Sequence, residues 1–193
     1  FRMIDTVTPP RLQPLARSMN QEPLLATATA LAECLVCHPK DLRLEIAESA
    51  RGFTITINGH RDDIGKLMGK ACRNVKAIQA ILAVITERDA KTVRVDIAEG
   101  WTGEKGDKRP ALEGLITNFA LRRLGVVCRH LFTKPFEIVI SGTSMSTTLT
   151  ARVKEPIRPE IEPNLQSVFK AFGGMNNHFL TIEVVPSNES GVA

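Results

Sequence analysis

A glycine that interrupts a helical pattern is the feature of this 193-residue chain that most restricts its fold. It is Gly69 in the segment DIGKLMGKACRNVKAIQAIL, residues 63–82, and apolar residues have helical spacing on both sides of it. Those before it are Ile64, Leu67 and Met68, and those after it are Val75, Ile78, Ile81, Leu82 and Ile85. Because glycine favours turns over helix interiors, the segment predicts a short helix, a tight turn and a second helix that begins near Arg73. Asp62 or Asp63 is expected to cap the short helix.

Strand patterns surround this pair of helices. Residues 42–48 and 52–58 alternate apolar and polar side chains, and residues 92–98 do the same after the second helix. Alternation with a period of two indicates strands with one buried face. A further helix is predicted to start at Pro23, where apolar residues begin to recur at helical spacing. Residues 23–99 therefore have the order helix, strand, strand, helix, tight loop, helix, strand.

The second half predicts another unit that mixes helices and strands. It covers residues 111–186 and follows a linker at 100–110 that is rich in glycine and charge. The predicted elements are a helix that stops at Gly125, three strands, a helix and a last strand. The strands after Gly125 are expected at 126–132, 136–142 and 146–154, the helix at 160–174 and the last strand at 178–185.

The predicted fold class is therefore α+β with two units. Residues 1–22 are expected to form an arm or linker, and residues 187–193 a tail. The second unit resembles the first in outline, but the glycine loop with its basic residues does not recur in it.

The composition indicates a globular protein with a mild positive charge. Hydrophobic residues make up 43% of the chain and charged residues 24%, which is enough for a buried core, and the net charge is +4. Neither half is a basic tail, so a nucleic-acid surface has to come from local clustering such as that around Gly69. No apolar run is long enough to span a membrane and no signal sequence is visible, so we expect a cytoplasmic protein without membrane contact.

The cysteines allow two sharper interpretations that the rest of the sequence does not support. Cys34, Cys37 and His38 match the form of covalent haem attachment, and the two cysteines also form half of a zinc site. Haem attachment needs an exported protein, and zinc needs a second close pair of ligands. We therefore expect Cys34 and Cys37 to be small hydrophobic residues on the buried side of a helix, with no metal and no cofactor.

The order of elements in 23–99, together with the glycine segment, resembles the KH (K-homology) domain of type II. It is similar to the small bacterial single-KH RNA-binding proteins. The residues that match in register are Asp63, Ile64, Gly65, Lys66, Leu67, Met68, Gly69, Lys70, Arg73, Lys76, Ala77 and Ile78. The resemblance implies a partner that is single-stranded RNA or DNA, and it says nothing about residues 101–193.

The physical logic of such a loop can be stated from the residues themselves. Free backbone N–H groups at the start of a helix attract phosphate, basic side chains add charge, and an adjoining apolar groove holds a few bases. The residues expected to contact nucleic acid are Gly65, Lys66, Gly69, Lys70, Ala71, Cys72, Arg73 and Lys76. The chain departs from the family's Gly-x-x-Gly loop at Cys72, whose side chain costs about 1 kcal/mol if the position needs a positive φ.

Two other classes of function were weighed against nucleic-acid binding. An assembly or adaptor protein, for example a viral one, would keep the KH scaffold without the nucleic acid, and residues 111–186 would then contact a protein partner or a second copy. An enzyme is not expected, because the hydroxyl-rich segment 141–150 has no recognisable histidine and acid partners.

Overall fold

The computed structural model of the chain describes residues 21–87, 90–98, 115–143 and 145–187. The first unit consists of α1 (Gln21–Leu35), β1 (Arg43–Ser49), β2 (Gly52–Asn58), α2 (Arg61–Met68), α3 (Arg73–Thr86) and β3 (Thr92–Ile97). The second unit consists of α4 (Ile116–Leu131), β4 (Phe136–Gly142), β5 (Ser146–Val153), α5 (Ile161–Met175) and β6 (Phe179–Pro186). Short 3-10 turns lie at Pro39–Asp41 and at Lys70–Cys72. The predicted α+β class and the element order of the first unit are confirmed.

Each unit has its own three-stranded sheet, and the two sheets have the same topology. In the first, β1 pairs antiparallel with β2, and β2 pairs parallel with β3. In the second, β4 pairs antiparallel with β5, and β5 pairs parallel with β6. The middle strand of each sheet is thus the second strand of its unit, and the last helix of each unit leads to the parallel strand.

The same hydrogen bond joins helix to strand in both units. The side-chain oxygen of Gln79 on α3 accepts from the backbone N–H of Val95 on β3. The side-chain oxygen of Gln166 on α5 accepts from the N–H of Ile182 on β6. In both cases the two residues are 16 positions apart in the chain, so α3 with β3 and α5 with β6 are equivalent substructures.

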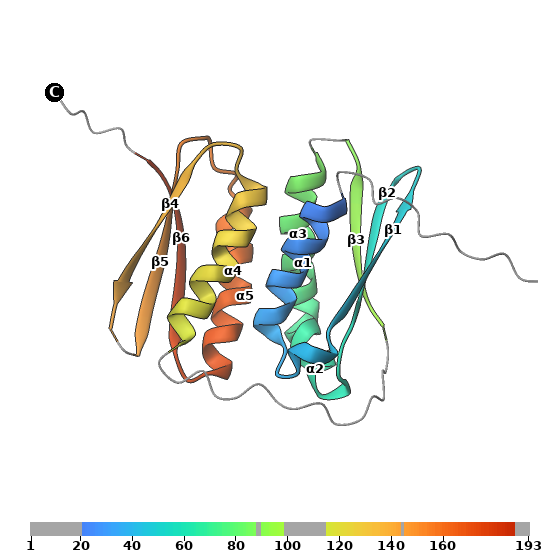
Figure 1. The fold of residues 1–193 in the computed structure, drawn as a ribbon, viewed down its shortest axis with the longest axis horizontal. Coiled ribbons are helices and arrows are strands. Elements are labelled where there is room, and N and C mark those ends of the chain that lie inside the picture. The colour runs from blue at the N-terminus through green and yellow to red at the C-terminus, as the bar shows by residue number, and fades with distance from the viewer. Residues whose placement is uncertain (1–20, 88–89, 99–114, 144, 188–193) are drawn as a thin grey trace, which may run out of the picture.

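The helices lie between the two sheets, as Figure 1 shows. α1 packs against α4, and α3 packs against α5. Fully buried side chains on these helices include Leu31 and Ile78 in the first unit and Leu124 and Phe169 in the second. A single hydrophobic cluster contains residues of both units, so the core is shared between them.

The predicted helix end at Gly125 and the predicted strand at 126–132 were wrong. α4 continues through Gly125 to Leu131, and residues 126–132, expected as a strand, lie mostly inside this helix. The reason is that Leu124, Val127, Cys128 and Leu131 continue the apolar face at helical spacing and are buried. A Cβ at Gly125 would have no neighbour within 4 Å, so this glycine is a tolerated helix-interior residue.

The remaining boundaries differ little from the predictions. Residues 21 and 22 belong to α1, although they were expected in the arm. The linker at 100–110 lies outside the described residues, as do residues 1–20 of the arm and all but Ser187 of the tail. In the part of the chain that the structure describes, no helix combines the length and apolar character needed to cross a membrane.

Candidate nucleic-acid interface

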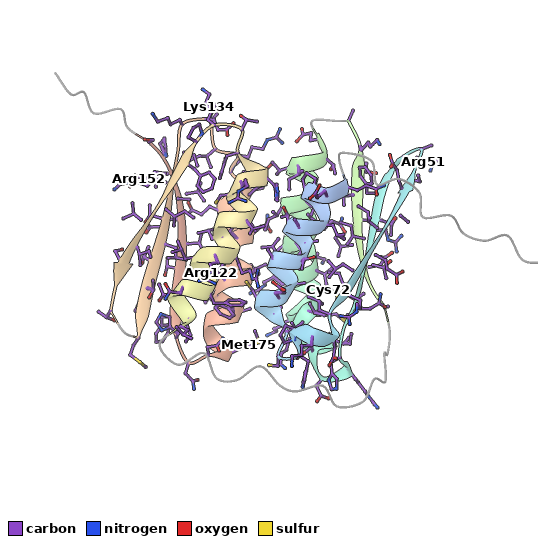
Figure 2. All side chains as sticks on the ribbon, in the orientation of Figure 1. Arg51, Cys72, Arg122, Lys134, Arg152 and Met175 are labelled. Atoms are coloured by element: carbon purple, nitrogen blue, oxygen red, sulfur yellow. The ribbon has the colours of Figure 1, made fainter. Side chains whose placement is uncertain are left out.

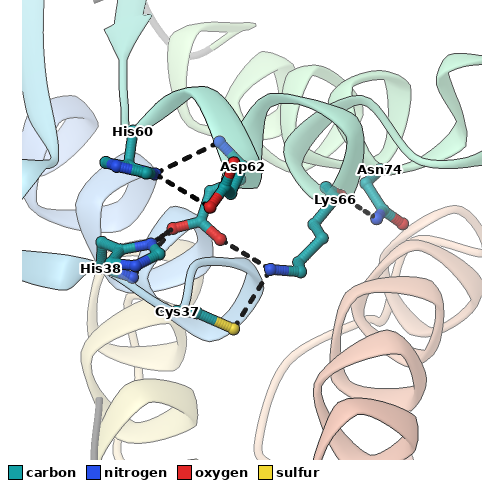
Figure 3. Close-up of polar contacts among 7 residues, drawn as sticks. Cys37, His38, His60, Asp62, Lys66 and Asn74 are labelled. Atoms are coloured by element: carbon teal, nitrogen blue, oxygen red, sulfur yellow. Dashed lines mark hydrogen bonds and ion pairs between the residues drawn. The ribbon is translucent and has the colours of Figure 1, made fainter. Parts of the chain in front are cut away.

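A buried polar cluster joins the start of α2 to the segment that follows α1 (Figure 3). Asp63 is fully buried, and one carboxylate oxygen accepts from the backbone N–H of His38 at 2.8 Å and lies 2.9 Å from His38 Nδ1. Its other oxygen accepts from Lys66 Nζ at 2.8 Å. Lys66 Nζ also donates to Cys37 Sγ at 3.2 Å. The cluster therefore joins two segments that are separate in the sequence, the one at Cys37 and His38 and the one from Asp63 to Lys66.

The charges in this cluster stabilise one another. Burial alone would raise the pKa of Asp63, but hydrogen bonds from Lys66, and from the segment at Cys37 and His38, outweigh it and lower the pKa below its ordinary 3.8. Burial alone would lower the pKa of Lys66, and Asp63 with Cys37 raises it instead. Both groups are thus charged at neutral pH, and the ammonium of Lys66 is directed at protein partners.

The cap of α2 is His60 and neither of the two predicted aspartates. His60 Nδ1 accepts from the backbone N–H of Asp62 at 3.2 Å, which satisfies one of the free donors of the first turn. The prediction of Asp62 or Asp63 as the cap was wrong because Asp63 is engaged in the buried cluster. The His60 and His38 rings stack with centroids 4.0 Å apart.

These histidines and Asp62 also form a group of possible metal ligands, whose ligand atoms lie within 4.8 Å of one another. In the structure, however, both Nδ1 atoms have other partners. His60 Nδ1 accepts a hydrogen bond from the backbone N–H of Asp62, and His38 Nδ1 lies 2.9 Å from the carboxylate of Asp63. Lys66 adds an ammonium 2.8 Å from the same carboxylate of Asp63, which opposes the binding of a dication. We read the group as a structural cap.

The loop between α2 and α3 contains three residues in the left-handed region of φ. Gly69 has φ 67°, Ala71 has φ 55° and Cys72 has φ 57°. A positive φ costs about 1 to 2 kcal/mol at a residue with a Cβ, so Ala71 and Cys72 hold a strained backbone. The fourth loop position, Cys72, thus has the positive φ whose cost the sequence analysis considered.

This conformation leaves two amide groups at the tip of the loop without an acceptor. The N–H of Cys72 donates to the carbonyl of Gly69, and that of Arg73 donates to the carbonyl of Lys70. Within the described residues, the N–H groups of Lys70 and Ala71 have no such partner. Both residues are exposed, so these donors are available to a ligand.

Asn74 holds the loop from inside, and the sequence analysis missed this residue. Its side-chain amide donates to the carbonyl of Lys66, near the end of α2, at 2.7 Å, and Asn74 is 7% exposed. A Cβ at Gly69 would lie 2.7 Å from the Asn74 amide nitrogen, so only glycine fits there. A polar residue at the second position of α3 is the one sequence signal of this role.

The predicted site residues all lie along one edge of the first unit, but they are not equally accessible. Lys70, Ala71, Arg73, Lys76 and Gly65 are exposed. Lys66, Gly69 and Cys72 are half-buried, and Lys66 is engaged with Asp63 and Cys37.

The cysteine prediction was correct in part. Cys34 is buried in α1, as expected, and its thiol donates to the carbonyl of Ala30. Cys37, in contrast, follows the end of α1 and accepts from Lys66. Cys128 is buried as well, and burial raises the pKa of its thiol to about 12. Cys34, Cys37 and Cys128 thus have structural positions in the fold, whereas Cys72 lies in the loop before α3.

Basic residues of the second unit lie on several of its elements. Figure 2 shows Arg122, Lys134 and Arg152 on different parts of this unit. Arg123 pairs with Glu33 of α1 at 2.7 Å and stacks on Phe119, so it joins the two units.

Comparison with known proteins agrees with the geometry of the first unit. The family model described as KhpA/KhpB, KH domain, matches residues 26–97. The RNA-binding protein KhpA of Halalkalibacterium halodurans is 32% identical over 69 residues, which are 36% of this chain and 91% of that protein. KhpA of Mycobacterium tuberculosis is 33% identical over 69 residues, or 36% of this chain and 82% of the relative.

A third relative extends the match slightly further. KhpA of Leifsonia xyli is 30% identical over 77 residues, which are 39% of this chain and 99% of that protein. The matches thus include nearly the whole length of these relatives, and the family model ends at the last strand of the first unit. Through this unit, the chain belongs to the KhpA/KhpB family of KH-domain proteins.

Proposed function

We propose that the first unit binds single-stranded RNA through the loop between α2 and α3. The observation that carries the proposal is the pair of amide groups without a backbone acceptor at the exposed residues Lys70 and Ala71, just before a 14-residue helix. The relatives that share this unit are named RNA-binding proteins, which favours RNA over DNA. It also favours nucleic-acid binding over the adaptor alternative.

In the proposed complex, the amides of Lys70 and Ala71 hold a phosphate at the loop. The dipole of α3 favours an anion there, and the side chains of Lys70, Arg73 and Lys76 surround it with positive charge. Gly65 and Gly69 leave room for the backbone of the strand, and Cys72 borders it. Lys66 contributes less directly, because its ammonium is already paired with Asp63. Bases would then lie along the first unit, as in KH domains, which clamp about four nucleotides.

This proposal assigns a different role to each half of the chain. Residues 23–99 would be the RNA-binding domain, and residues 111–186 a second domain that covers its helices and offers further surface to a protein partner or a second copy. The proposed role is binding without catalysis. A cytoplasmic location is also proposed, and its only support is the proposed RNA ligand.

The proposal is tested by measuring the affinity of the full chain for a mixed-sequence, fluorescein-labelled single-stranded RNA by anisotropy at several salt concentrations. If phosphates are bound, affinity falls with salt, with a logarithmic slope of about −0.7 for each phosphate contacted. A parallel titration with DNA of the same sequence measures the preference for RNA. Binding that is undetectable at low salt, or that does not respond to salt, would refute the proposal.

A further inference from the structure

A cavity of about 570 Å³ lies between α5 and β6 in the second unit. Its lining includes Gln166, Lys170 and Gly174 from α5 and Phe179, Leu180 and Thr181 from β6. Phe179 is 76% exposed, and it is the one aromatic side chain among the large apolar residues found exposed in the described part of the chain. A solvent-exposed phenylalanine at the rim of a mostly apolar cavity is typical of a binding site.

The cavity lies at the same end of the molecule as the proposed phosphate loop. Arg158, just before α5, forms an ion pair with Glu87 at the end of α3. Because α3 packs against α5, this pair makes the two helices antiparallel (Figure 1). The last turn of α5, with Gly174, therefore lies beside the first turn of α3, with Arg73. Packed helix axes are about 8–10 Å apart, which a strand of a few nucleotides can cross.

The equivalent positions of the first unit carry different side chains. Gln79 and Gln166 are equivalent, so positions counted from them can be compared. Four residues further on, the first unit has Ala83 and the second has Lys170. Eight residues further on, the first unit has Glu87 and the second has Gly174. The first strand residue is Thr92 in β3 and Phe179 in β6. The second unit thus combines a cation, an aromatic face and open space, and among the described residues no acidic side chain lines its cavity.

From these observations we propose that the cavity between α5 and β6 binds a nucleobase of the strand whose phosphate is held at the loop of the first unit. Phe179 would stack on the base, and Lys170 would contact the adjoining phosphate. A stacked base fits any sequence, because every base presents a π face. The inference rests on the proposed function and adds a second contact region, in the half of the chain outside the family match.

The test compares RNA strands of 4 and 12 nucleotides. A KH domain binds about four nucleotides, so the shorter strand is used up at the loop of the first unit, and only the longer strand can also reach the cavity. Two variants of the full chain are used. Phe179→Ala removes the aromatic ring on which the base would stack. Gly174→Glu introduces a glutamate at the position where the first unit has Glu87. A Cβ at Gly174 would have no neighbour within 4 Å, so the second change is compatible with folding. Gly125→Glu is the matched control, since this glycine also lies in a helix with open space around it.

Each of the two variants is expected to weaken binding of the 12-nucleotide RNA at least about fivefold, as expected for the loss of one stacked base, and to leave the 4-nucleotide RNA unchanged. The Gly125→Glu control should bind both RNAs as the unmodified chain does. Unchanged binding of the long RNA by both variants would overturn the inference while the proposed function stands. Failure of the unmodified chain to bind either RNA would overturn both.

Discussion

The two units of this chain share a scaffold and differ at one connection. In the first, the segment from the end of β2 to the start of α3 contains α2 and the loop with Lys70 and Ala71. In the second, residues 154–160 join β5 directly to α5. Sheet topology and the bond from the helix glutamine to the parallel strand are the same in both.

The difference shows that α2 and its loop are not required to build this fold. The second unit closes its shorter connection with contacts of its own, in which Glu155 accepts from the backbone of Thr133 and Lys134, and Arg158 pairs with Glu87. The first unit instead maintains a strained loop, held by Asn74 and by a buried carboxylate. Strain of this kind persists where the surrounding structure enforces it, and it is common at functional sites.

The largest effect is expected from the substitution of aspartate for Lys70 and Ala71 together. Two carboxylates at the place of the phosphate repel it, and the affinity for single-stranded RNA should fall about 100-fold or more. Anisotropy titrations at low salt measure this change.

The matched control lies in the equivalent connection of the second unit. Lys154→Asp combined with Pro156→Asp makes the same change in charge and should leave the affinity within about twofold. Equal losses in both double variants would mean that net charge, and not the loop, controls binding.

Asp63→Ala is expected to reduce stability substantially, because the first unit depends on this carboxylate, the one acidic side chain that is fully buried among the described residues. The change leaves the N–H of His38 without its acceptor and the ammonium of Lys66 without its counter-ion. We expect a loss of about 2 kcal/mol in the free energy of unfolding, measured in urea. A loss below about 0.5 kcal/mol would show that the cluster is not needed to hold α2.

The same carboxylate predicts a pH dependence. Its pKa is lower in the folded state than the ordinary 3.8, so its contribution is fully present above that value and is lost as pH falls through the folded pKa. The difference in stability between the unmodified chain and Asp63→Asn should therefore shrink as pH falls below about 4. A constant difference between pH 6 and pH 3 would contradict this assignment.

Removal of the Asn74 side-chain amide should moderately reduce the stability of the first unit and its affinity for RNA. Asn74→Ala loses the bond to the carbonyl of Lys66, which contributes about 1 kcal/mol, and the loosened loop should bind RNA several-fold more weakly. Asn74→Asp removes the donor while keeping the shape, so it should weaken binding at neutral pH at least as much as Asn74→Ala. Unchanged affinity in both variants would show that Asn74 does not position the loop.

The glutamines test whether the two units are equivalent in energy as well as in topology. Both Gln79→Ala and Gln166→Ala remove the hydrogen bond from the N–H of the parallel strand, which contributes about 1 kcal/mol to the free energy of unfolding. Gln166 also donates to the carbonyl of Leu180 at 3.2 Å, so Gln166→Ala should cost more than Gln79→Ala, by about 1 kcal/mol. A larger loss for Gln79→Ala would show that the equivalence is limited to the backbone.

The smallest change is expected for Cys72→Gly. Relief of the positive φ is partly offset by the greater freedom of glycine in the unfolded chain, so stability should rise by only about 0.5 kcal/mol. RNA affinity should increase modestly if the thiol crowds the strand. Weaker binding than that of the unmodified chain would mean that Cys72 itself contacts the ligand.

The sequence predicted local features of the fold well and the interactions between distant residues poorly. Gly69 and the apolar spacing around it correctly placed the turn between α2 and α3, and period-two alternation identified all three strands of the first unit. The end of α4 was missed because Gly125 was given more weight than the continuing apolar face.

The candidate site was predictable only where it consists of consecutive residues. Lys70 and Ala71 were named because they follow Gly69. The roles of His38 and Asp63 depend on a contact across 25 residues, which a single sequence does not show. The glutamine bonds that reveal the likeness of the two units are spaced equally in the chain, but the residues around them differ.

The central claim is that amide groups at the loop of the first unit bind phosphate, and that the second unit has no equivalent. It is tested most directly by titrating the ¹⁵N-labelled chain with unlabelled single-stranded RNA and following each backbone amide by NMR. The account predicts that the amides of Lys70 and Ala71 shift most, downfield as they donate to phosphate, while those of residues 154–160 stay in place. Unmoved loop amides at saturating RNA, or equal shifts in both connections, would contradict it.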